Sequence, residues 1–260
     1  HAENNEIIEK NKKKFSKSSD PLIHSKVRNN ESESLAIEHL LEIQNKIKNK
    51  LYFCHVSSKE SLKLIEEAKE EGVNVFCEVT PHHLFFNDKS LEKLRNFGKV
   101  NPSIKSEKDR LALWRGIKSG VVDVVASDHA PHLISEKKQP YWSAPSGMPG
   151  VQTMLLVLLD AVKKKKISLE DIHRLCCENP AKIFGIESKG SIRDGFLADF
   201  AIVDLNKKTR FSNKMVYSKC GWSAFNGVTF EGRIEKTILG GKLAFDNGKF
   251  FKEVLGKEVF

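Results

Sequence analysis

Three short apolar runs, separated by segments with helical spacing, restrict the folds open to this chain. The runs cover residues 50–57, 73–79 and 120–126, and each has a His, Asp or Glu at or near its C-terminal end. Between the first two runs, apolar residues recur at helical spacing from Lys59 to Glu71, and Gly72 ends that helix. Strands that alternate with helices in this way predict a parallel sheet covered by helices, as in an α/β barrel.

The third run is followed directly by Ser127-Asp128-His129-Ala130-Pro131-His132. Side chains just beyond the carboxyl ends of barrel strands form the catalytic face of such a fold. A carboxylate there can bind a metal and accept a proton from water, and a histidine four residues later can contact an anionic substrate. Taken alone, the segment also fits an Asp that caps a helix beside incidental histidines. The histidines that follow the other two runs favour a catalytic face.

Six segments carry a family resemblance: His1-Ala2-Glu3-Asn4, Cys54-His55-Val56-Ser57, Cys77-Glu78-Val79-Thr80-Pro81-His82-His83-Leu84, Val100-Asn101-Pro102, Ser127-Asp128-His129-Ala130-Pro131-His132 and Gly147-Met148-Pro149-Gly150-Val151-Gln152-Thr153. In this order and at this spacing they closely resemble a class I dihydroorotase, a member of the amidohydrolase superfamily. The Ser-Asp-His-Ala-Pro-His and Gly-Met-Pro-Gly segments are the most specific. The resemblance covers essentially the whole chain from His1 onward.

The resemblance implies the C-terminal part of a TIM-like (β/α)8 metal-dependent hydrolase barrel and a small β-sandwich domain. From Lys189 onward, turns and short strands replace the helical spacing, and Asn247-Gly248 predicts a hairpin. We therefore expect the barrel at 1–187, with its first strands missing, and the C-terminal half of the β domain at 188–260.

The family's first barrel strand carries a His-x-His pair, which this sequence lacks. A whole barrel also takes about 250 residues, more than the barrel-like part here. We therefore expect the chain to be the C-terminal part of a longer polypeptide and to be inactive on its own.

The resemblance also implies roles for particular residues. His1 and His55 would bind one zinc ion of a two-zinc site and Asp128 the other, with the remaining ligands upstream of His1. Asp128 would also be catalytic, because it would accept a proton from the attacking water and deliver it to the leaving amide nitrogen. A histidine at the start of a chain also fits the remnant of a tag. The positions that match substrate-binding residues are Asn101, His132, Ser146 and Gly147.

These residues predict a dihydroorotase, which interconverts L-dihydroorotate and N-carbamoyl-L-aspartate in pyrimidine synthesis. Hydantoinases and allantoinases share the barrel and the metals, but they tend to lack the histidine that stands here at 132. A third possibility is a catalytically inactive dihydroorotase-like scaffold subunit. The partners implied are the small-molecule substrate, the N-terminal segment of the same protein, and either further copies of the protein or aspartate carbamoyltransferase.

Composition limits the remaining classes of function. The net charge is +9, but the lysine-rich stretches 10–14 and 163–166 contain no interleaved aromatic residues, so we expect no nucleic-acid partner. A positive field can still attract a dianionic substrate. The five cysteines show no Cys-x-x-Cys spacing, which favours a reducing, cytoplasmic location. No apolar run is long enough to span a membrane.

Overall fold

Two structural units account for residues 1–254, 256 and 258, which the computed structural model describes. Unit 1 comprises residues 1–154 and 212–226. Unit 2 comprises residues 155–211 and the described residues from 227 onward. The chain therefore leaves unit 1, returns to it and leaves it again. The expected division into a barrel segment at 1–187 and a β domain at 188–260 stays a prediction.

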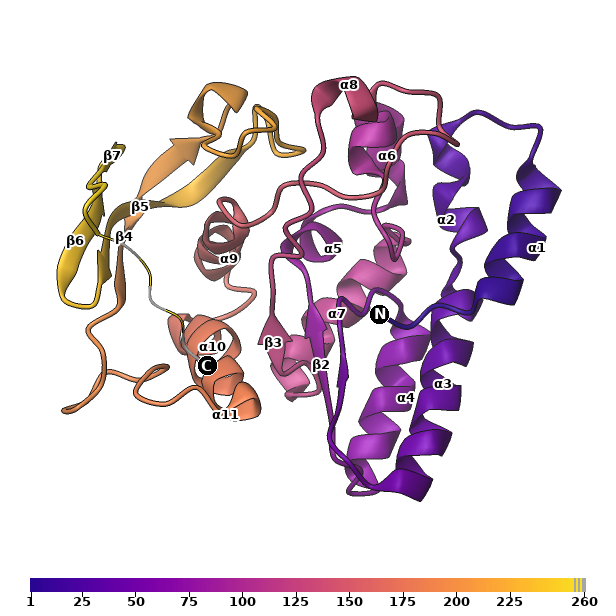
Figure 1. The fold of residues 1–260 in the computed structure, drawn as a ribbon, viewed down its shortest axis with the longest axis horizontal. Coiled ribbons are helices and arrows are strands. Elements are labelled where there is room, and N and C mark those ends of the chain that lie inside the picture. The colour runs from indigo at the N-terminus through magenta and orange to yellow at the C-terminus, as the bar shows by residue number, and fades with distance from the viewer. Residues whose placement is uncertain (255, 257, 259–260) are drawn as a thin grey trace. The chain divides into compact units, whose positions relative to one another are not determined.

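A parallel sheet with the strand order β1–β2–β3 forms the centre of unit 1 (Figure 1). β1 (Leu51–Phe53) pairs in parallel with β2 (Val75–Val79), and β2 pairs in parallel with β3 (Val124–Val125). Each predicted apolar run contains one of these strands, although the strands are shorter than the runs. Parallel strands place all three carboxyl ends at one edge of the sheet, and this edge carries the candidate site.

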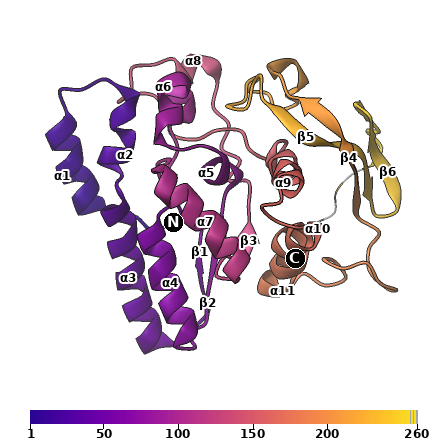
Figure 2. The same cartoon turned by 180° about the vertical axis from the view of Figure 1, so that it is seen from behind.

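Helix α4 (Lys59–Glu70) connects β1 to β2, where the apolar spacing predicts a helix. The Ser58 side chain accepts a hydrogen bond from the Ser61 amide and so caps its first turn. Its apolar side packs against β2 and against the helices α3 (Asn30–Ile47) and α7 (Glu107–Ser119), as Figure 2 shows from behind. The shorter helices of unit 1 are α1 (Asn5–Phe15), α2 (His24–Val27), α5 (Pro81–Phe85), α6 (Leu91–Leu94) and α8 (Ile134–Lys137).

The returning segment 212–226 completes the apolar core of unit 1. The buried Trp222 donates a hydrogen bond from Nε1 to the carbonyl of His132, with a distance of 2.7 Å. The Phe225 ring lies 5.2 Å from the Phe85 ring and 4.8 Å from the Phe86 ring, measured between centroids. The backbone of the Asp128–His132 motif is thus supported by residues about ninety positions later in the sequence.

Unit 2 combines helices with an antiparallel sheet in the order β4–β5–β6–β7. The turn at Asn247 and Gly248 joins β6 to β7, which confirms the predicted hairpin. The Glu231 amide donates to Asp160 Oδ1 at 3.1 Å, so the sheet is tied to the first helix of the unit. The second half of a β sandwich stays a prediction. The elements are α9 (Met154–Lys163), α10 (Leu169–His173), α11 (Asn179–Phe184), β4 (Phe200–Arg210), β5 (Thr229–Leu239), β6 (Lys242–Asp246) and β7 (Lys249–Phe250).

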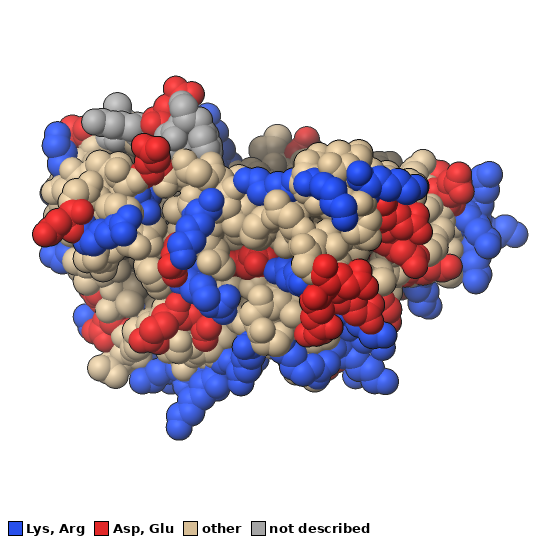
Figure 3. Space-filling model, turned by 90° about the horizontal axis from the view of Figure 1, so that it is seen from below, with Lys and Arg blue, Asp and Glu red and all other residues tan. Residues whose placement is uncertain are grey.

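Charges of both signs are interspersed over the face shown in Figure 3. Lys12 pairs with Glu9 at 2.6 Å and Lys63 with Glu67 at 3.3 Å, both one helical turn apart. Exposed pairs of this kind contribute only about 0.2–1 kcal/mol each to stability. None of the helices in the described part of the chain has the length and apolar character needed to cross a lipid bilayer.

Candidate active site

The rings of His1 and His55 converge at the carboxyl end of β1. His1 Nδ1 lies 3.1 Å from His55 Nε2, and the two rings meet edge to face at 79°. His55 directly follows the strand region and is buried, with 7% of its surface exposed, and this burial lowers its pKa. A neutral imidazole is the form that binds a metal, so the structure keeps His55 in a ligand-competent state.

A carboxylate at the end of β2 holds the backbone of His55. Glu78 Oε1 accepts from the His55 amide at 3.2 Å, and Glu78 Oε2 accepts from the Tyr52 hydroxyl at 2.6 Å. Burial raises the pKa of Glu78, and the negative charge of Asp128 adds to this effect. Glu78 therefore serves as a structural link between the ends of β1 and β2.

Asp128 follows β3 and is half-buried, and burial raises its pKa. The next residue anchors the motif, because His129 Nδ1 accepts from the Gly150 amide at 3.1 Å. The Ala130 amide donates to the Met148 carbonyl at 3.1 Å. The two most specific sequence segments are therefore hydrogen-bonded to each other.

Two of the predicted substrate-binding segments also lie side by side. His132 Nε2 donates to the carbonyl of Ser146 at 3.0 Å, since a carbonyl oxygen only accepts. Gly147 has φ +138°, and a Cβ there would lie 2.6 Å from the carbonyl oxygen of Ala130 and 3.0 Å from His132 Cδ2. Only glycine permits this close approach. The structure thus brings His132, Ser146 and Gly147 together.

Asn101 lies in a loop that two buried histidines hold in place. His24 Nε2 donates to the Val100 carbonyl at 2.8 Å, and His83 Nε2 donates to the Pro102 carbonyl at 3.1 Å. Asn101 Oδ1 is buried and has no hydrogen-bond partner among the described residues. A buried acceptor without a partner is costly in a folded protein, so this oxygen is a suitable contact for a ligand N–H.

Two buried lysines shape the same region, and neither was a candidate from the sequence. Lys137 is fully buried, and its Nζ donates to the carbonyls of Pro145 and Gly147 at 2.9 Å each. Lys99 Nζ donates to the Tyr141 carbonyl at 2.7 Å. Burial lowers the pKa of Lys137 to about 7 and that of Lys99 to about 8. No sequence pattern marks these lysines, because loop carbonyls rather than an apolar periodicity decide their burial.

The His1–His55 pair fits two ligands of one metal ion. Nitrogen ligands about 2.0–2.1 Å from a tetrahedral zinc ion lie about 3.3–3.4 Å from each other, close to the 3.1 Å between His1 Nδ1 and His55 Nε2. In residues 1–254, 256 and 258, however, no three His, Cys, Asp or Glu side chains lie close enough together to hold a metal ion. Two imidazole nitrogens are fewer than the three or four protein ligands that a zinc site has.

Known proteins resemble this chain in sequence and in fold. A model of the amidohydrolase family matches residues 1–244. A curated dihydroorotase from Methanosarcina acetivorans is 42% identical over 79% of this chain and 46% of its own length. Another, from Methanothermobacter thermautotrophicus, is 32% identical over 96% of this chain and 56% of its own length. The chain thus spans about half the length of the curated relatives it matches.

Solved structures show the same fold. The L-hydantoinase of Arthrobacter aurescens has a TM-score of 0.93 and 31% identity, covering 96% of this chain and 57% of that chain. The dihydropyrimidinase of Brevibacillus agri has a TM-score of 0.91 and 26% identity over the same shares. The paired histidines and the Asp128 motif lie at the ends of parallel strands. Because the family model matches residues 1–244, this chain belongs to the amidohydrolase family.

Proposed function

We propose that this chain contributes the catalytic residues of a dihydroorotase, which makes and breaks the amide bond that separates L-dihydroorotate from N-carbamoyl-L-aspartate. The observation that carries this proposal is the convergence of His1 Nδ1 and His55 Nε2 at the end of β1. Asp128 follows the parallel strand β3. Curated relatives between 32% and 42% identical to the chain are named dihydroorotases.

Zinc is the metal that we propose for this site. His1 and His55 would hold one ion, and Asp128 would bind a second. When bound, a divalent cation would supply Lewis-acid chemistry at the substrate carbonyl. Because no three potential ligand side chains lie close enough together in the described part of the chain to hold a metal ion, we also propose that this chain on its own binds zinc weakly and shows no turnover.

Asp128 is the proposed general base and general acid. It would take a proton from the attacking water and deliver it to the leaving amide nitrogen, so that the C–N bond breaks after the C–O bond forms.

Substrate recognition is assigned to the side chains of Asn101 and His132 and to the backbone of Ser146 and Gly147. The unpartnered Asn101 Oδ1 would accept an N–H of the ring. His132 donates from Nε2 to the Ser146 carbonyl, and its Nδ1 lies 3.8 Å from Glu136 Oε2. We assign the His132 ring to the substrate carboxylate.

A hydantoinase is the second candidate, because solved hydantoinases share the fold and one is 31% identical to this chain. Hydantoin carries no carboxylate for His132 to bind. Steady-state kinetics of the native protein on dihydroorotate and on hydantoin separate the two functions. We expect a higher kcat/KM for dihydroorotate, and a preference for hydantoin would overturn the proposal. A cytoplasmic location stays a prediction from the cysteine pattern. Further copies of the protein and aspartate carbamoyltransferase as partners stay predictions from the resemblance.

A further inference from the structure

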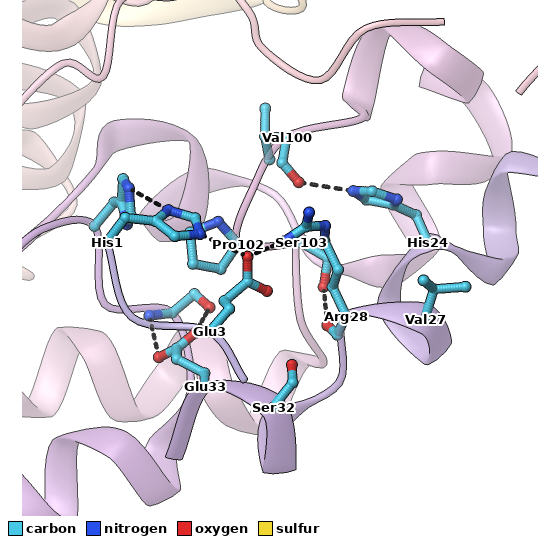
Figure 4. A network of polar contacts seen from close by, with 12 residues as sticks. His1, Glu3, His24, Val27, Arg28, Ser32, Glu33, Val100, Pro102 and Ser103 are labelled. Atoms are coloured by element: carbon cyan, nitrogen blue, oxygen red, sulfur yellow. Dashed lines mark hydrogen bonds and ion pairs between the residues drawn. The ribbon is translucent and has the colours of Figure 1, made fainter. Parts of the chain in front are cut away.

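Glu3 connects the candidate ligand His1 to the partly buried cation Arg28. Its Oε2 lies 3.0 Å from His1 Nε2, and the same oxygen accepts from Arg28 Nη1. The Glu3 side chain is only 1% exposed, whereas that of His1 is 46% exposed. Figure 4 shows Glu3 between His1 and Arg28. The buried Glu3 carboxylate therefore holds the more exposed His1 ring in place.

The contact sets the tautomer of His1. A carboxylate only accepts hydrogen bonds, so the proton of the neutral His1 ring lies on Nε2. Nδ1 then carries a lone pair, and this is the nitrogen that lies 3.1 Å from His55 Nε2. Metal-binding histidines commonly donate their second ring N–H to a carboxylate, which fixes the ring orientation and raises ligand basicity.

Arg28 contacts Glu3 through its side chain and is bound in turn through its backbone carbonyl. The backbone carbonyl of Arg28 accepts from Ser103 Oγ at 2.7 Å and from Lys105 Nζ. Both donors follow Asn101 closely in the chain. The contacts therefore run without a break from the loop of Asn101 through Arg28 and Glu3 to His1. Figure 4 shows Ser103, Arg28, Glu3 and His1 together.

We propose that Glu3, supported by Arg28, is a positioning residue that presents His1 Nδ1 to the metal. This inference rests on the proposed metal role of His1 and His55. Glu3 touches neither the substrate nor the reacting atoms, so it acts only through the His1 ring.

Zinc affinity of the native protein, measured by competition with a chromophoric chelator, tests this role without any need for turnover. We expect Glu3→Ala to weaken zinc binding about 10–100-fold, the range found when a partner of this kind is removed. Glu3→Gln keeps an acceptor for His1 Nε2 but loses the charge, so it should recover part of the affinity. Arg28→Met should weaken binding less than Glu3→Ala, because the Glu3–His1 contact remains.

Asp109→Asn is the matched control, since Asp109 is a buried carboxylate, 2% exposed, that caps α7 through Ser106. It should lower thermal stability and leave zinc affinity unchanged. If the unsubstituted native protein bound zinc and both Glu3 variants bound it equally well, the positioning role would be wrong and the metal role of His1 would stand. If the unsubstituted native protein bound no zinc, both assignments would be overturned. Should Glu3→Ala not fold, Glu3→Gln against Asp109→Asn decides the question.

Discussion

His55 and Asp128 adopt the same unusual backbone conformation at corresponding ends of two parallel strands, with φ 38° and φ 42°. Neither residue is a glycine, and positive φ is uncommon for side chains with a Cβ. Each such residue costs of order 1–3 kcal/mol, and this cost concentrates at functional sites. Glycine would adopt this backbone conformation at less cost at both positions. The presence of His55 and Asp128 is therefore explained by what their side chains do.

We predict that His55→Ala and His55→Gly both abolish zinc binding and keep the fold. The glycine variant should be the more stable of the two by about 1 kcal/mol, because glycine adopts positive φ without a penalty. Elemental analysis and urea unfolding measure the two effects. His39→Ala is the control, since the His39 side chain is 72% exposed on the surface of α3. Normal zinc content in the His55 variants would exclude His55 as a ligand.

Replacing His132 by Ala should lower kcat/KM for dihydroorotate in the native protein. The expected loss of transition-state stabilisation is about 2–4 kcal/mol, as for the loss of a desolvated charged contact. Zinc content should stay unchanged, because the ligands are intact. Steady-state kinetics on dihydroorotate and hydantoin, with zinc measured in both proteins, check this. Full activity of the variant on dihydroorotate would show that another group binds the substrate carboxylate.

Gly147→Ala should distort the segment that faces His132. The added Cβ would meet the Ala130 carbonyl oxygen at 2.6 Å, and φ +138° is closed to alanine, so we expect a loss of roughly 2–4 kcal/mol of stability. Gly72→Ala is the matched control, because Gly72 also has positive φ but nothing lies within 4 Å of the added Cβ. It should cost only about 1 kcal/mol. Equal losses in urea unfolding would contradict the packing argument.

Acid should unfold this protein through its buried histidines. Burial lowers the pKa of His24 and of His82 to about 3 in the folded state, from an ordinary value of 6.5. Between pH 6.5 and pH 3 the unfolded chain binds protons that the folded chain does not, so the free energy of unfolding falls as the pH falls. Each histidine contributes at most about 1.4 kcal/mol per pH unit.

Urea titrations at several pH values measure that slope. His24→Gln should be less stable at pH 7, because it disturbs the hydrogen bonds to Tyr141 and Val100, but its stability should depend less steeply on pH. The exposed His39→Gln should leave the slope as it is. An identical slope in His24→Gln would mean that His24 does not resist protonation in the folded state.

Periodicity was enough to predict the elements that position the site. The helix expected at 59–71 and the hairpin turn at Asn247-Gly248 are both present, since each rests on local apolar spacing or turn chemistry. β3 contains only Val124 and Val125, although the apolar run is seven residues long. The Val122 amide donates to the Gly116 carbonyl at the end of α7 instead of to a strand. Apolar composition alone does not show whether the amide of a valine bonds to a neighbouring strand or to the end of a helix.

The polar framework of the site was much less predictable. Glu3 stands two residues after His1 in an extended segment, which places both side chains on one face, and this signal was available in the sequence. Lys137 gave no such signal, because its partners are carbonyls brought together by a loop. The ligand and substrate roles of individual residues come from the family resemblance and stay predictions until zinc and substrate binding are measured.

The return of residues 212–226 to unit 1 has a consequence for synthesis on the ribosome. Domains generally begin to fold while the chain is still emerging, yet unit 1 cannot bury Trp222 and Phe225 until more than fifty residues of unit 2 have been translated. The aromatic rings of Phe85 and Phe86 stay without this partner throughout that interval. Apolar surface of unit 1 is therefore open to aggregation between the completion of α8 and the emergence of Phe225.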